Sequence, residues 1–172
     1  MKRLLFILLP LLLLTSCDST YELINQKNNS IKMDRDKAIL VTTAKNGFYE
    51  NKEYKKSGEK TTASLQAKLR PYASSVDVTP VNSFSKIDKD ELLNYDYIIS
   101  PDIYHWEDRA TNMNYMPDKI ILGITVYDNT GNILNYIEIK GESTKVTFAN
   151  NDPIELVNEA LDMYIRKLFN MY

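Results

Sequence analysis

Residues 105–109, His-Trp-Glu-Asp-Arg, bring the chain's only histidine and only tryptophan next to two carboxylates and a guanidinium. His105 paired with Asp108, or the two carboxylates together, could perform general acid–base chemistry. His105 with Glu107 or Asp108 could instead begin a metal site, because alternate residues of a strand share one face. Zinc needs three or four protein ligands, and the chain has no second histidine and one cysteine.

Other signs of catalysis are missing from the sequence. There is no G-x-S-x-G nucleophile motif, and five glycines leave no glycine-rich loop of the kind that holds nucleotides. We therefore predict no catalytic residue, no metal and no cofactor.

Two further roles for residues 105–109 remain open. An aromatic ring beside charges suits contacts with sugars or peptides, which makes all five residues candidates for binding: His105, Trp106, Glu107, Asp108 and Arg109. In a purely structural role, Trp106 would fill the edge of the core while Arg109 pairs with Glu107 or Asp108 and fixes the loop. Of the three roles considered for this segment, the structural one is the most expected, binding comes next and catalysis is the least expected.

The first residues are typical of a secretory signal. Lys2 and Arg3 precede an apolar run at 4–14, which is shorter than the roughly 20 residues of a membrane-spanning helix. Leu-Thr-Ser-Cys at 14–17 resembles the lipobox of bacterial lipoproteins. We predict a signal peptide at 1–16 and attachment to membrane lipid through acylated Cys17, since two or more acyl chains anchor a protein stably.

The location that follows is the cell envelope, on a membrane and facing the periplasm. Asp18, directly after the lipidated cysteine, favours the inner membrane. Without residues 1–16 the chain has 19 basic and 23 acidic residues, a net charge of −4. Nucleic-acid binding needs a basic surface, so we predict no nucleic-acid partner.

The rest of the chain divides into a tether and one domain. Residues 17–36 hold the lipidated cysteine and a polar run that predicts a flexible tether, with an N-terminal strand around 23–24 as the less favoured alternative. Residues 37–172 predict a single domain.

Apolar patterning predicts the elements of that domain. Strands are expected at 38–43, 76–79, 95–99, 119–127 and 133–139, with a further short one at 144–148. Helices are expected from about 61 to Pro71, at 88–94, and from an Asp152 cap to the end, with Pro153 at the first position and Glu155 completing a capping box. An apolar stripe on the last helix should face the core: Ile154, Val157, Leu161, Tyr164, Leu168 and Met171.

The resulting order is β-α-β-α-β-β-β-α. It predicts an α/β (α+β) sandwich, in which helices pack on a mixed sheet. Segments 45–60 and 105–116 are expected to be loops, and Tyr49, Tyr54 and Tyr115 within them are candidate interface residues.

Two stretches resemble a known family. They are YDYIISPDIYHWEDRATNMNYMPDKIILGITVYDNTGNIL, with HWEDRAT at its centre, and KGESTKVTFANNDPIELV. Together with the signal, the lipobox cysteine and the run from Ile39 through Ser57-Gly58, they resemble the domain-of-unknown-function 4823 (DUF4823) family of bacterial lipoproteins. The likeness covers most of the mature chain and implies an envelope lipoprotein, but that family supplies no catalytic residue.

The functional hypothesis is a lipid-anchored, non-enzymatic module that binds an envelope protein or glycan through segments 45–60 and 105–116. One alternative is a small hydrolase or metal-assisted enzyme that uses His105, Glu107 and Asp108. The other is that residues 105–109 serve folding alone.

Overall fold

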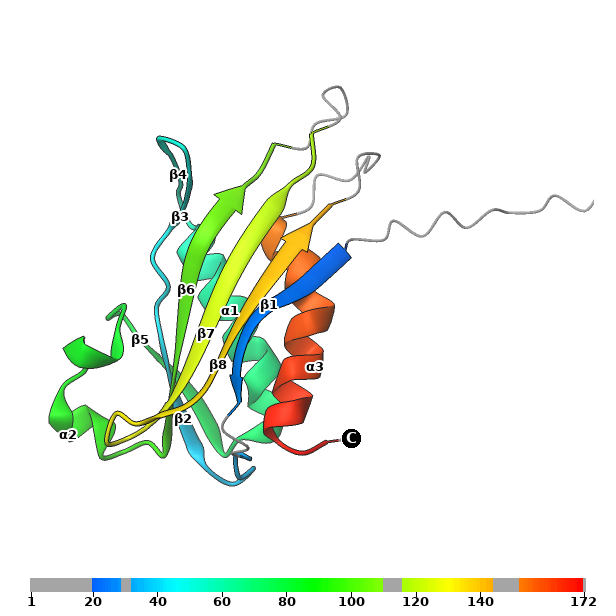
Figure 1. Cartoon of the computed structure of the whole chain (residues 1–172). Coiled ribbons are helices and arrows are strands. Elements are labelled where there is room, and N and C mark those ends of the chain that lie inside the picture. The colour runs from blue at the N-terminus through cyan, green and yellow to red at the C-terminus, as the bar shows by residue number, and fades with distance from the viewer. Residues whose placement is uncertain (1–19, 29–31, 110–115, 144–151, 172) are drawn as a thin grey trace, which may run out of the picture.

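A mixed sheet of six strands organises the part of the chain that this computed structural model describes, namely residues 20–28, 32–109, 116–143 and 152–171. The strands follow the order β1-β8-β7-β6-β2-β5 (Figure 1). Their bounds are β1 Thr20–Asn28, β2 Ala38–Thr42, β5 Ser75–Thr79, β6 Tyr97–Glu107, β7 Lys119–Asp128 and β8 Ile133–Glu142. β2 runs parallel to β5 and β6, and the other pairs are antiparallel.

Helices cover the sheet unevenly. The longer helices, α1 (Ser57–Leu69) and α3 (Asn158–Leu168), lie behind the sheet in Figure 1. The short α2 (Lys89–Leu92) packs on the other face, where it covers part of β2 and β6. Three 3₁₀ turns complete the connections: η1 (Arg70–Tyr72), η2 (Phe84–Lys86) and η3 (Pro153–Val157). Apart from β1 and a small hairpin, the order is the expected one, and the α+β sandwich is confirmed.

The core lies between the sheet and the pair α1 and α3. Alternate residues of β7 and a stripe on η3 and α3 are buried there, as their periods of two and about 3.6 residues predict. The buried residues of these two sets are Ile120, Leu122, Ile124, Val126, Ile154, Val157, Leu161, Tyr164 and Leu168. Each large aliphatic side chain buried in this way contributes about 1.5–3 kcal/mol. Met171 is 43% exposed, so the stripe ends before it.

The tether prediction is wrong for residues 20–28, which form β1 along the outer edge of β8. The less favoured alternative, an N-terminal strand, is what the structure shows. Leu23 and Ile24 are both exposed, so β1 is held by backbone pairing with an edge strand rather than by burial of an apolar face. A strand of that kind leaves no apolar pattern in the sequence.

Segment 45–60 is not a loop. It contains the hairpin of β3 (Gly47–Tyr49) and β4 (Lys52–Tyr54), and α1 then begins at Ser57 instead of near residue 61. The first turn of α1 is polar, so the apolar spacing used for prediction starts one turn late.

Two other boundaries differ from expectation. β6 continues to Glu107 instead of ending near residue 99. After Asp152 the chain forms η3, and α3 begins only at Asn158. The Asp152 side chain makes no cap bond and pairs with Lys60 instead. The expected strand at 144–148, Tyr115, Cys17 and the signal lie outside the described residues.

Among the described residues, no helix combines the length and apolar character that crossing a membrane requires.

Candidate functional site

A β-bulge decides how residues 105–109 are presented. Ile103 pairs with Leu122 and His105 pairs with Ile121, so Tyr104 is an extra residue in β6. The extra residue exchanges the two faces for the rest of the strand. Trp106 therefore joins the core on the helix side, where it is 2% exposed.

The β3–β4 hairpin lies against this end of β6. A Cβ atom at Gly47 would fall 2.4 Å from the Cβ of Trp106, so a glycine is needed for the two strands to approach. The Ser57 hydroxyl donates to the Tyr54 carbonyl (2.6 Å) and accepts from the Gly47 backbone N–H (2.7 Å). These two bonds fix the hairpin to the start of α1.

Glu107 is the centre of a closed charge network. Its side chain is 3% exposed, accepts a hydrogen bond from His105 (Nε2–Oε2 distance 2.9 Å) and forms an ion pair with Arg109. A carboxylate can only accept, so Nε2 carries the proton of this bond. Burial lowers the pKa of His105, and the nearby charges of Lys119 and Arg109 lower it further, so the imidazole is neutral at pH 7.

Contacts around Arg109 complete the network. Its guanidinium carbon lies 4.7 Å from the centre of the Tyr49 ring, and the same ring meets His105 edge-on at 5.4 Å. The backbone N–H of Arg109 donates to the carboxylate of Asp118 at 2.6 Å. His105, Glu107 and Arg109 therefore hold one another, the hairpin and the neighbouring strand in place.

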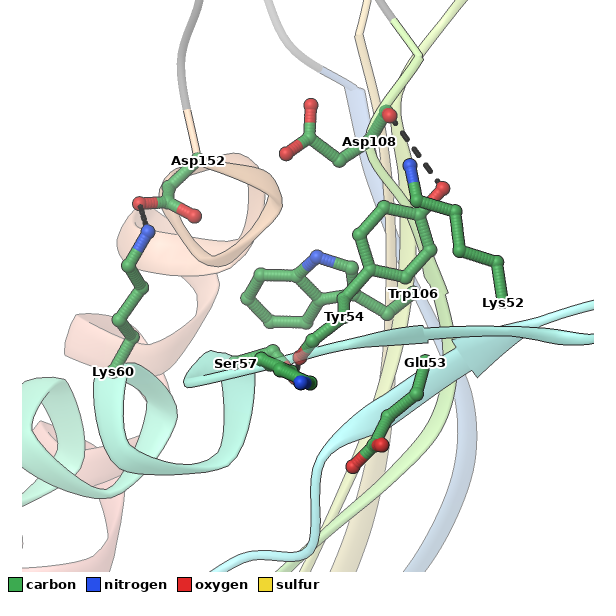
Figure 2. A pocket seen from close by; sticks show the side chains of 9 residues that line it. Lys52, Glu53, Tyr54, Ser57, Lys60, Trp106, Asp108 and Asp152 are labelled. Atoms are coloured by element: carbon green, nitrogen blue, oxygen red, sulfur yellow. Dashed lines mark hydrogen bonds and ion pairs between the residues drawn. The ribbon is translucent and has the colours of Figure 1, made fainter.

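On the other side of the same segment is a pocket of about 270 Å³. Figure 2 shows the Trp106 indole inside it, with the Lys60–Asp152 ion pair on one side and Tyr54 on the other. Its walls come from the hairpin, the start of α1, the end of β6 and the residue before η3. The lining residues are Lys52, Glu53, Tyr54, Lys55, Ser57, Lys60, Trp106, Asp108 and Asp152.

Asp108 is an exposed acid of this pocket. Its backbone carbonyl accepts a bond from the Tyr54 hydroxyl (3.5 Å), but its carboxylate makes no hydrogen bond or ion pair with any described residue. Partial burial raises the pKa of Asp108, and the charges of Asp118 and Asp152 raise it further, while Lys52 and Lys60 act in the opposite direction. The chain thus keeps an unpaired carboxylate where its charge is disfavoured.

The structure separates the five candidates into two groups. Trp106 and Asp108 line the pocket, whereas Glu107 is not among the lining residues and is held by His105 and Arg109. His105, Glu107 and Asp108 therefore do not converge on one pocket. Within the described residues, no group of three or more His, Cys, Asp or Glu side chains is arranged to hold a metal ion.

Sequence reasoning missed much of the lining. Tyr54 was an interface candidate, but Lys60 and Asp152 are 92 positions apart and pair only through the fold. No local pattern links them.

A family match covers residues 31–168. The matching model is a domain of unknown function, DUF4823. The chain belongs to this DUF4823 family. Comparison with curated proteins finds no match.

Solved structures show where the fold recurs. PelC from Paraburkholderia phytofirmans, solved as a dodecamer, is similar with a TM-score of 0.63 at 12% identity, over 88% of this chain and 97% of that one. A variant of the same PelC gives 0.63 at 11% identity, over 90% and 100%. The hypothetical protein CT253 from Chlamydia trachomatis gives 0.48 at 8% identity, over 76% and 93%. At these identities the DUF4823 chain shares a fold with PelC.

Proposed function

We propose that this DUF4823 protein is a lipid-anchored module of the cell envelope that faces the periplasm and binds an envelope protein or glycan without catalysing a reaction. The observation that carries the proposal is the pocket beside Trp106. Four separate segments build it, and it presents the unpaired carboxylate of Asp108. A carboxylate in that state contributes nothing to folding that the structure shows, so a ligand is a reason for the chain to keep it.

The geometry favours binding over acid–base catalysis. Glu107 is charge-balanced by Arg109 and hydrogen-bonded to His105, so neither group faces a substrate in the pocket. The other groups of the lining that could act with Asp108 are already engaged. The Ser57 hydroxyl is bonded to the backbone of Gly47 and Tyr54, Asp152 is paired with Lys60, and Glu53 accepts a bond from Asn46.

Acylation of Cys17 supplies the anchor in this proposal. Wild-type protein should incorporate labelled palmitate and sediment with membranes, whereas Cys17→Ser protein should do neither. Palmitate labelling of the variant would contradict the anchor. Separation of the inner and outer membranes on a sucrose gradient then tests whether Asp18 directs the protein to the inner one.

Site-specific photo-crosslinking in living cells tests the binding surface. A photoreactive residue replaces Lys55, which lines the pocket, and a matched probe replaces Lys167, an exposed residue on α3. We expect a saturable adduct from position 55 that is weaker in Asp108→Asn protein, and no such adduct from position 167. Adducts between copies of the chain are scored separately, because the PelC of similar fold is a dodecamer.

The choice of variant also separates binding from a purely structural role. Asp108→Asn removes a side-chain charge that no described residue pairs with, so it should leave the fold intact. Equal adducts at positions 55 and 167, or an adduct at 55 that does not respond to Asp108→Asn, would contradict the proposal.

A further inference from the structure

The indole N–H of Trp106 has no acceptor within the described part of the chain. Trp106 is 98% buried, yet no described residue accepts a hydrogen bond from its Nε1. Figure 2 shows the nitrogen on the side of the ring that faces the pocket, toward Asp108. Although the indole ring is buried, its Nε1 is not among the buried polar side-chain atoms of the described residues that have no partner, so this atom is open to the pocket. The pocket therefore presents a donor that awaits an acceptor.

An unpaired acceptor lies beside this donor. The carboxylate of Asp108 faces the same space and has no partner among the described residues. A ligand that satisfies both must accept a bond from the indole and donate one to the carboxylate. An anion between these two groups would be repelled by Asp108, whose charge no described residue pairs with, and an ammonium group has no lone pair for the indole. A hydroxyl does both with one oxygen atom.

The rest of the lining agrees with a ligand rich in hydroxyls. Lysine, serine and acidic side chains surround the two aromatic rings, and Lys52 Nζ lies 4.2 Å from the centre of the Tyr54 ring. At about 270 Å³ the pocket is at the small end of ligand sites, which suits one sugar ring of a chain that continues into solvent.

We infer that the pocket binds an uncharged glycan segment, with one hydroxyl bridging Trp106 Nε1–H and the Asp108 carboxylate. This inference rests on the proposed function and names the ligand class for it. Lys52 and Lys60 add donors for further sugar oxygens at the rim.

Because the chain has one tryptophan, a single indole ¹H–¹⁵N resonance reports on the bridge. The lipidated, ¹⁵N-labelled chain in detergent micelles is titrated with hexamers of glucose and N-acetylglucosamine, which are uncharged. Hexamers of glucosamine and galacturonate are the cationic and anionic controls. We expect an uncharged hexamer to move the indole proton downfield with saturation, and the charged hexamers to leave it in place.

Two variants locate the bridge. Asp108→Asn replaces a charged acceptor with a weaker neutral one, so the dissociation constant of the uncharged hexamer should rise about five- to tenfold. Glu159→Gln is the matched control, because Glu159 is an exposed acid on α3 that does not line the pocket. It should bind as the wild type does.

The outcomes separate this inference from the function on which it rests. A response to a charged hexamer alone, or equal affinity in Asp108→Asn protein, overturns the bridge. No response to either uncharged hexamer overturns the glycan inference, while a surviving cross-link at position 55 would still support a binding module. Loss of both the response and the cross-link overturns both.

Discussion

Two aspartates at strand ends have opposite surroundings. Asp128 ends β7, and its carboxylate accepts four hydrogen bonds from Thr130 and Asn132 at 2.7–2.9 Å. Burial alone would raise the pKa of Asp128, but these bonds lower it to about 2. Asp108, just after β6, accepts no such bond and its pKa is raised. Asp128 serves the turn between β7 and β8, whereas Asp108 serves nothing that the fold displays.

The same contrast recurs between neighbours in sequence. Glu107 and Asp108 are adjacent acids, yet the first is buried between a histidine and an arginine and the second is exposed at a pocket. The bulge at Tyr104 decides which of them faces the pocket. Residues 105–109 thus contain both a structural framework, made by His105, Glu107 and Arg109, and a candidate ligand contact, Asp108. Mutations should distinguish the two.

Glu107→Gln should give the largest effect. Removing one partner of a buried ion pair costs about 3–5 kcal/mol, and the low end applies here because the Arg109 side chain is 34% exposed. We expect the free energy of unfolding in urea to fall by about 3 kcal/mol. Glu159→Gln, an exposed acid on α3, should lie within about 0.5 kcal/mol of wild type. A loss below 1 kcal/mol in the free energy of unfolding for Glu107→Gln would show that Glu107 does not stabilise the fold as argued.

Asp128→Ala should come next, with a loss of about 1–3 kcal/mol at pH 7 from the turn bonds to a charged acceptor. The pKa of Asp128 is about 2 in the folded chain and 3.8 ordinarily. Its contribution is therefore complete above pH 3.8 and is lost as the pH falls toward 2. Urea unfolding at pH 7 and pH 2.5 measures this. Asp36→Ala, at an exposed position, is the control, and a loss of equal size at both pH values would contradict the account.

Local signals in the sequence predicted the main strands and helices but not the pocket. The alternation in β7 and the apolar stripe of α3 are set by neighbours within a few residues. The HWEDR segment was recognised because it gathers rare residue types.

What the sequence could not predict depends on contacts between distant segments. The bulge at Tyr104 breaks the period of two with no glycine to mark it, so the faces of Trp106 and Glu107 could not be assigned. The hairpin strands β3 and β4 have three residues each, which is too few for an alternating pattern. β1 is held by backbone hydrogen bonds, which do not depend on the type of side chain. Lys60 meets Asp152 only once α1 and η3 share one face of the sheet.

Asp108→Asn should have the smallest effect on stability, and its sign is the informative part. Partial burial and neighbouring acids raise the pKa of Asp108 above 3.8, so the ionised side chain disfavours the folded state at neutral pH. The variant should therefore unfold at an equal or slightly higher temperature than wild type at pH 7. The corresponding gain in the free energy of unfolding should be no more than about 0.5 kcal/mol. The gain should disappear as the pH falls below 3.8, where the carboxyl is protonated in both states.

Thermal unfolding of wild type and Asp108→Asn at pH 7 and pH 3 measures the difference. A clear loss of stability at pH 7 would place Asp108 with Asp128 as a residue required by the fold, and the comparison between them would fail. A gain in stability accompanied by weaker cross-linking at position 55 would mean that the chain keeps an unfavourable charge for the sake of a ligand. That combination distinguishes a binding residue from a structural one, because a framework residue cannot be removed with a gain in stability and a loss of binding together.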